Sequence, residues 1–263
     1  MEKEKLQKFN IPFNENEKLE KLISKVKRDE VLKTLLRMSN INAINRMGYN
    51  DHGPIHIRII ANSALKILRI LIKRGVAPNV VKNYGLKNED AEIVVVLAAI
   101  LHDIGHAVHR DGHEVFSTFF AASIIDKLLD DIYKQEEEKA IVKFETLHAI
   151  YSHESRIIPL TIEGGVMKVA DALDMEKGRA RIPYQIGSIN IHSVSAMAVE
   201  KVEILEGKEK PVKIIILMSN PAGIFQVDEL LKEKIKTSGI EKMLEVEVRL
   251  IKDRKEKLFK KYD

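Results

Sequence analysis

Histidine is distributed unevenly along this chain. Eight of the nine histidines lie between residues 52 and 153, where an even distribution would place roughly 3.5. Imidazole is a common ligand of divalent transition metals, and histidines from several helices can enclose one or two ions together with aspartates. The alternative is a set of surface or core-edge histidines. The eight are His52, His56, His102, His106, His109, His113, His148 and His153.

Aspartates follow two apolar segments. His102 and Asp103 end the stretch LAAILHDIGH, and Asp171 and Asp174 lie in VMKVADALDM. A carboxylate at the edge of a dry core is costly unless a cation or hydrogen-bond donors compensate it. A metal ion is one such cation. For Asp171 the simpler alternative is an ion pair with Lys168 on a helix surface.

Composition restricts the chemistry further. The chain has 263 residues without Cys or Trp, which excludes disulfides, thiolate nucleophiles and cysteine-held metal clusters. Its net charge of +4 is too near balance to predict polyanion binding. The sequence has no Walker lysine loop, GxGxxG or GxSxG motif, so motor, hydride-transfer and α/β-hydrolase activities have no local support. Any metal must be held by His, Asp or Glu.

The elements that must position these residues are helical up to about residue 185. Apolar residues recur at three- and four-residue spacing in six segments, near 19–26, 55–72, 93–104, 116–124, 141–151 and 166–173. The nine-residue apolar run 93–101 is too short to span a membrane and predicts a helix buried on all sides. Gly53-Pro54 and the break at 110–112 predict that new helices begin near Pro54 and His113.

After Pro183 the period changes. Strands are predicted near 199–204, 212–218 and 244–250, with a helix through 227–235 between the last two. Ile189 and Ile191 also alternate with polar residues. The expected fold class is mainly α, with an all-helical body (1–185) and a small α+β appendage (186–263) of order β-β-α-β. The basic tail, 252–263, is expected to be a solvated helix end, and nucleic-acid contact is the less favoured interpretation.

The order His56, His102-Asp103, Asp171, with helices between them, resembles the HD-domain superfamily of metal-dependent phosphohydrolases over about residues 40–185. The resemblance implies that these four residues hold a first metal ion and that Asp103 bridges to a second. The second ion would take His113 or His109 and His153 or His148, of which we expect His113 and His153. The metal is divalent, and the sequence does not distinguish Mn, Mg, Fe, Co, Ni and Zn.

Other residues have roles that are less constrained. In the cyclic-nucleotide phosphodiesterase branch a His placed like His52 protonates the leaving oxygen, which makes His52 a candidate general acid; otherwise it caps the helix entry. His106 could orient a ligand. Lys168, Arg179 and Arg181 are candidate phosphate contacts, with a solvated basic turn as the alternative for the arginines. Gly164-Gly165 could offer helix-start amides to a phosphate.

The resemblance implies an enzyme that cleaves a phosphoester of a small molecule, in the first instance a nucleotide, through a hydroxide shared by two metal ions. The alternatives are an HD-type di-iron oxygenase and a non-catalytic metal- or nucleotide-binding regulatory module. We expect a cytoplasmic location without membrane association, because the chain opens without a signal-peptide pattern. Residues 186–263 are a candidate homo-oligomer surface, and abundant Lys, Glu and Ile with 5% aromatics favour a thermophilic source.

Overall fold

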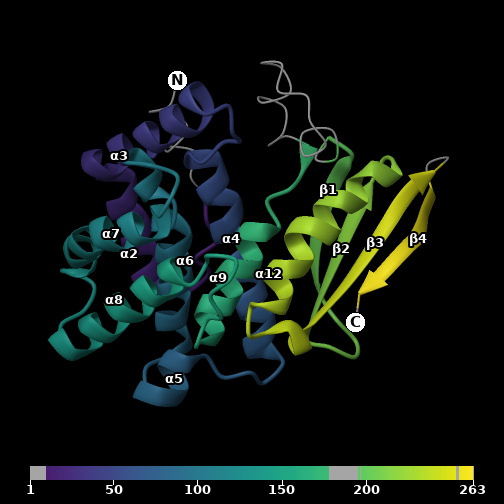
Figure 1. Cartoon of the computed structure of the whole chain (residues 1–263). Coiled ribbons are helices and arrows are strands. Elements are labelled where there is room, and N and C mark those ends of the chain that lie inside the picture. The colour runs from purple at the N-terminus through teal and green to yellow at the C-terminus, as the bar shows by residue number, and fades with distance from the viewer. Residues whose placement is uncertain (1–9, 178–194, 196, 253–254, 263) are drawn as a thin grey trace.

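The computed structural model describes residues 10–177, 195, 197–252 and 255–262, and it consists of a helical body followed by a small sheet (Figure 1). The six predicted helical segments are present as six helices, which confirms the mainly α fold class. They are α2 (Glu17–Arg28), α4 (Pro54–Lys73), α6 (Asn88–Leu101), α7 (His113–Leu129), α8 (Glu136–Tyr151) and α9 (Ile162–Ala172). The described body also contains elements that were not predicted: α3 (Glu30–Asn40), α5 (Asn79–Tyr84), η1 (Ile41–Arg46) and η2 (Ile104–Ala107).

Helix α6 is the centre of the body. Each residue from 93 to 101 is fully buried, as predicted, because α2, α4, α8 and α9 pack around the helix. α7 begins at His113 after Gly112, whose φ of 73° is a left-handed conformation that favours glycine. The buried face of α7 differs from the predicted stripe, since Phe119 is 76% exposed. The small residues Ser117 and Ala121 are buried instead, which lets η2 approach closely.

The C-terminal sheet has the order β1-β2-β3-β4, in which only the central pair β2 and β3 is parallel. Its strands are β1 (Val199–Glu206), β2 (Val212–Met218), β3 (Leu244–Lys252) and β4 (Lys255–Tyr262). A parallel pair requires a crossover, and here it contains η3 (Pro221–Gly223), η4 (Gln226–Leu231), α12 (Lys232–Lys236) and η5 (Glu241–Met243). The predicted order β-β-α-β is present up to β3.

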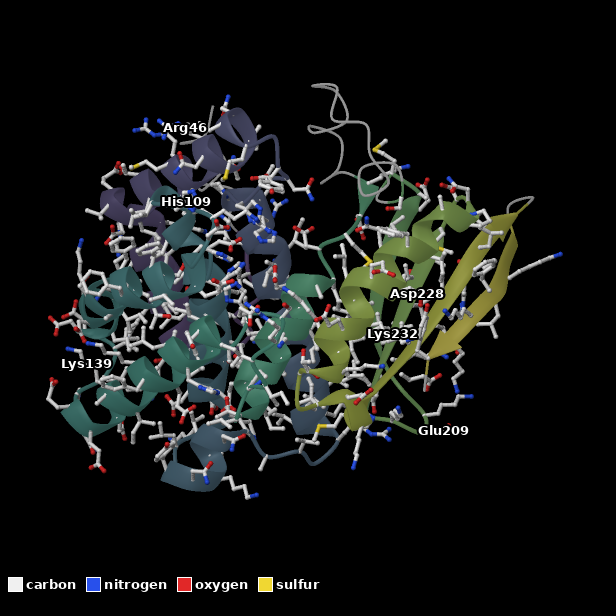
Figure 2. All side chains as sticks on the ribbon, viewed as in Figure 1. Arg46, His109, Lys139, Glu209, Asp228 and Lys232 are labelled. Atoms are coloured by element: carbon white, nitrogen blue, oxygen red, sulfur yellow. The ribbon has the colours of Figure 1, made fainter. Side chains whose placement is uncertain are left out.

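The expected helix end at the basic tail is wrong, because that segment forms β4. In β4, Lys260 Nζ lies 2.9 and 3.0 Å from the two carboxylate oxygens of Asp228. Tyr262 donates to the same carboxylate at 2.7 Å, and Asp228 lies in the C-terminal unit (Figure 2). β4 forms an antiparallel hairpin with β3, in which Lys252 pairs with Lys255, and the charge pattern of the tail does not encode this pairing. Ile189 and Ile191 lie outside the described residues.

The C-terminal unit packs directly on α9, and α12 lies between α9 and the sheet (Figure 1). A Cβ at Gly165 would be 2.5 Å from the carbonyl oxygen of Ser238, so this contact requires glycine. Thr237 Oγ1 also donates to Ser155 O at 2.7 Å. The amides of Gly164 and Gly165 both donate to Thr161, so this helix start is an ordinary capped one and does not offer these amides to a phosphate.

Among the described residues, no helix has both the length and the apolar character needed to cross a membrane. The boundary predicted at residue 185 lies outside the described residues, and the division into two domains stays a prediction.

Candidate metal centre

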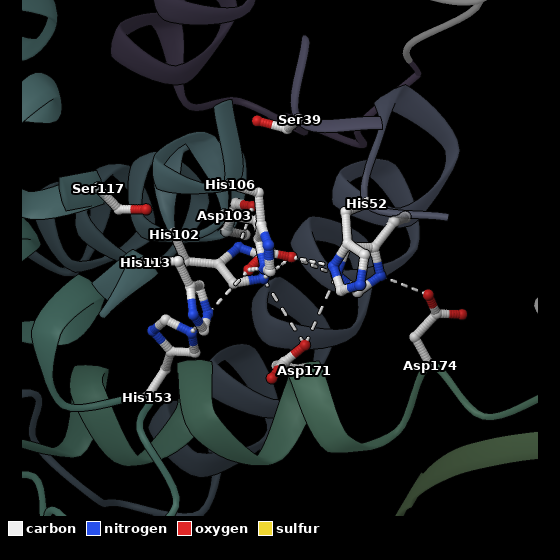
Figure 3. A network of polar contacts seen from close by, with 12 residues as sticks. Ser39, His52, His102, Asp103, His106, His113, Ser117, His153, Asp171 and Asp174 are labelled. Carbon is white, nitrogen blue, oxygen red and sulfur yellow. Dashed lines mark hydrogen bonds and ion pairs between the residues drawn. The ribbon is translucent and has the colours of Figure 1, made fainter. Parts of the chain in front are cut away.

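The predicted first ligand set comes together from α4, the end of α6 and α9, and Figure 3 shows His102, Asp103 and Asp171 of this set facing one another. His56 lies in the first turn of α4, which begins with Pro54. His102 and Asp103 follow the last residue of α6, and Asp171 lies in the last turn of α9. His56 Nε2 is 3.2 Å and His102 Nε2 is 3.1 Å from Asp103 Oδ2, and both nitrogens are 3.6 Å from Asp171 Oδ1.

The two imidazoles of this set are oriented as metal ligands would be. His56 Nδ1 lies 2.5 Å from Asp174 Oδ2, and His102 Nδ1 lies 3.0 Å from the carbonyl oxygen of Ala99. These acceptors place a proton on each Nδ1, so that Nε2 can present a lone pair to the site. Both Nε2 atoms are buried without a hydrogen-bond partner among the described residues. A cation between them and the carboxylates would satisfy these atoms.

A second group of histidines lies on the other side of Asp103. His113 Nε2 and His106 Nε2 are each 3.4 Å from Asp103 Oδ1, and His153 Nε2 is 3.3 Å from His113 Nε2. The Nδ1 atoms of His113 and His153 are hydrogen-bonded to the carbonyl oxygens of Arg110 and Ile150. Their Nε2 lone pairs therefore face each other, and a proton or a metal ion must separate them. Asp103 directs one oxygen toward each group, as a bridging carboxylate would.

The structure brings together His113 and His153, whereas the alternatives lie elsewhere. The His109 side chain is 62% exposed and its Nδ1 accepts a hydrogen bond from the Asp111 amide. His148 Nε2 accepts from the amide of Leu160 at 3.0 Å. His106 is fully buried and stacked on His113 at 4.1 Å, and it belongs to a group with Asp103 that could hold a metal.

The loop before α4 places His52 against Asp103. The His52 amide donates to Asn40 Oδ1, and Gly53 donates to Asp51 Oδ1, which fixes the loop. His52 Nδ1 is 2.6 Å from Asp103 Oδ2, so the residue contacts the candidate ligand set directly. Its expected role as a general acid stays a prediction.

The electrostatics favour a bound cation. Burial alone would raise the pKa of Asp103, but His102 and His52 hold it well below its usual range. Burial would likewise raise the pKa of Asp171, which Lys234 and His102 hold well below its usual range. Burial opposes protonation of His102, yet Asp103 and Asp171 raise its pKa to about 10. In the metal-free protein a proton on His102 therefore compensates the carboxylates, and a divalent ion would take that place.

Burial lowers the pKa of His153 well below its ordinary value, with the charge on His102 acting in the same direction. Burial also lowers the pKa of His106. Both rings are thus neutral near pH 7, which is the form that ligates metals. The described residues contain several His/Asp groups able to hold a metal ion.

Lys168 does not act as the expected phosphate contact. It is fully buried, and its Nζ donates to the carbonyl oxygens of Glu154, Ser155 and Ile157 at 2.7–2.9 Å. Its ammonium therefore holds the loop after α8. Nor does it form the alternative pair with Asp171, because Asp171 pairs with Lys234. Arg179 and Arg181 lie outside the described residues.

A cavity of about 420 Å³ opens onto the two histidine groups. Its lining includes Asp103, Asp171 and His153 from the helical body, together with Gln226, Leu230 and Lys234 from the C-terminal unit. Gln226, Leu230 and Lys234 were not predicted from the sequence. Lys234, for example, lies in a charged, amphipathic segment that gives no local indication of its partner. The size lies in the range of small-molecule sites.

The protein is thus a helical protein with a buried His/Asp cage whose residues could hold a metal ion. The family model described as HD domain matches residues 56–176, from His56 to just past Asp171 and Asp174. The chain therefore contains an HD domain and belongs to the HD-domain superfamily.

The chain is also 48% identical over 237 residues to the uncharacterized protein MJ1020 of Methanocaldococcus jannaschii, a match that covers 88% of this chain and 91% of the relative. The similarity therefore extends well beyond the HD domain. No solved structure matches this chain.

Proposed function

We propose that this protein is a phosphohydrolase that cleaves a phosphoester of a small molecule, with a nucleotide as the first substrate to test, using two divalent metal ions. One observation carries the proposal: the buried Nε2 atoms of His56 and His102 have no hydrogen-bond partner among the described residues, and both face the carboxylates of Asp103 and Asp171. This arrangement is unfavourable without a cation and is suited to one.

The residues divide into two ligand groups that share one carboxylate. His56, His102 and Asp171 would hold the first ion, His113 and His153 would hold the second, and Asp103 would contribute to both. Bound divalent ions supply Lewis acidity toward phosphate oxygens and make a water-derived nucleophile available near neutral pH. The cavity that opens onto both groups would admit the substrate.

His52 would deliver the proton to the leaving group. Its Nδ1 contacts Asp103 Oδ2 at 2.6 Å, and this carboxylate would stabilise the protonated imidazole. Nε2 is then the atom that carries the proton to the substrate. Replacement of His52 with Gln is expected to lower kcat while the bound metal is retained.

The test combines metal analysis with hydrolysis. Protein loaded anaerobically with Mn²⁺ should contain two ions per chain and hydrolyse p-nitrophenyl phosphate, bis-p-nitrophenyl phosphate or a member of a nucleotide panel. His113→Gln and His153→Gln should each lose one ion. His109→Gln and His148→Gln are the matched controls and should lose none. Absence of bound metal, or the same metal content in the His113 and His153 variants as in the His109 and His148 variants, contradicts the proposal. An oxygen-dependent product with iron and no hydrolysis would favour the oxygenase alternative.

A further inference from the structure

Lys234 is the residue of the C-terminal unit that reaches the metal centre. It lies in α12, and its Nζ pairs with Asp171 Oδ2. The other oxygen of that carboxylate faces His56 Nε2 and His102 Nε2 at 3.6 Å. The ammonium group is thus separated from the candidate metal position by a single carboxylate. The Lys234 side chain is 23% exposed and lines the cavity, so a ligand in the cavity can reach it.

Few positively charged side chains line this cavity. Among the described residues that line it, Arg110 and Lys234 are the Lys or Arg side chains. The Arg110 guanidinium lies over the ring of Tyr49 at 4.6 Å. Lys168 is close in sequence to Asp171, but three carbonyl oxygens occupy its ammonium. Lys234 is therefore the positively charged side chain next to Asp171 that a phosphate in the cavity could contact.

The fold holds Lys234 in this place. α12 is anchored on the helical body through Thr237, whose hydroxyl donates to Ser155 O, and through the close contact of Gly165 with Ser238. Asp171 holds the ammonium until a ligand arrives. With its negative charge shared with a bound cation, the Asp171 carboxylate would attract Lys234 less strongly, and the ammonium N–H groups could then donate to an anion. A lysine ammonium is a compact charge with three donors, well suited to phosphate oxygens.

We propose that Lys234 contacts the substrate phosphate, so that the C-terminal α+β unit completes the active site of the helical body. This inference rests on the proposed phosphohydrolase function. It gives the C-terminal unit a direct part in substrate binding, in addition to the oligomerisation role that stays a prediction.

The test measures phosphate binding as well as turnover. Inorganic phosphate is titrated calorimetrically into metal-loaded wild-type protein and into Lys234→Gln, Lys234→Arg and Lys236→Gln. Lys236 is a matched control, because it lies in the same helix but lines a separate groove beside Tyr262. Metal affinity is measured separately without phosphate. Folding is checked by circular dichroism, and Lys234→Met serves as a second neutral variant if Lys234→Gln does not fold.

Loss of a hydrogen bond to a charged group predicts that Lys234→Gln binds phosphate about 10- to 100-fold more weakly and that its KM rises by a similar factor. Lys234→Arg should restore part of the affinity, and Lys236→Gln should match wild type. Metal affinity should stay equal or increase, since a positive charge near the ion has been removed.

Two results overturn the inference. One is unchanged phosphate affinity in Lys234→Gln. The other is a lower metal affinity in that variant, because Lys234 would then position Asp171 and not bind substrate. Failure of the proposed function is distinct, since it appears in the wild-type protein as absent metal or absent hydrolysis.

Discussion

Asp174 offers the sharpest test of how the metal centre is built, because it contacts the cage without belonging to the predicted ligand set. Its Oδ2 lies 2.5 Å from His56 Nδ1, and the residue is 6% exposed. The change to Asn keeps the shape of the side chain and a carbonyl oxygen that can accept the Nδ1 proton. It removes the negative charge that orients the imidazole and makes it a stronger ligand.

The expected magnitude follows from that geometry. Partners that hold a ligating histidine typically contribute 10- to 100-fold to metal affinity, which corresponds to about 1.4–2.7 kcal/mol. Asp174→Asn should fall in this range for the ion at His56. Asp174→Ala should lose more, because Nδ1 then has no acceptor and the ring is free to change tautomer or rotate. The ion at His113 and His153 should be affected little, since those rings are held by backbone carbonyls.

The assay is competition for Mn²⁺ or Zn²⁺ against a chelator of known affinity, which resolves a tight and a weakened site. Asp111→Asn is the matched control, because that side chain is 93% exposed and should leave both affinities unchanged. Metal affinities within twofold of wild type in Asp174→Asn would refute the reasoning. An equal loss at both ions would also refute it, because it would indicate a general disturbance of the fold.

Three further predictions concern stability and pH. Lys168→Met should lower the free energy of unfolding by about 3–5 kcal/mol in chemical denaturation, because three carbonyl oxygens lose their donor. Gly105→Ala should cost about 3 kcal/mol, since its Cβ would be 2.1 Å from His113 O; Gly48→Ala, with φ 68° and open space, should cost about 1 kcal/mol. The pKa of His102, raised to about 10 by nearby carboxylates against the effect of burial, lies above its unfolded value of about 6.5. The contribution of protonated His102 to the free energy of unfolding is therefore full below about pH 6.5 and is lost as the pH rises toward about 10. The free energy of unfolding of the metal-free protein should decrease over this interval. Metal binding is then measured by calorimetry at pH 7.5 in buffers of different ionisation enthalpy. The dependence of the observed enthalpy on the buffer should correspond to release of about one proton from His102. A dependence that corresponds to proton uptake would contradict this.

Local patterns in the sequence predicted six helices of the body but missed α3 and α5. The run 93–101 predicted a fully buried helix, and Gly112 marked the start of α7, because helix periodicity and glycine conformation depend on neighbouring residues. The same break favoured His113 over His109, and the structure places His113 in the cage. β4 was missed because its lysines resemble an exposed tail until β3 and Asp228 are brought beside them.

The lysines show where sequence reasoning reaches its limit. Lys168 lies three residues before Asp171, and this spacing suggested either a surface ion pair or a phosphate contact. The structure turns its ammonium toward the loop at 154–157. The actual partner of Asp171 is Lys234, 63 residues away. Side chains of lysine are long and their partners are set by tertiary packing, so charge spacing alone identified the wrong lysine.

The imidazole anchors connect the metal centre to the ends of its helices. His102, His113 and His153 each contact, through Nδ1, the carbonyl oxygen three residues earlier, at Ala99, Arg110 and Ile150. Two of these carbonyls lie in the last turns of α6 and α8, where backbone oxygens lack partners within the helix. The same contact therefore satisfies a helix end and directs Nε2 into the site. The position of a ligand then depends on the residue at which the helix ends. This explains why a motif as short as His-Asp can be sufficient to place two ligands where an apolar helix ends.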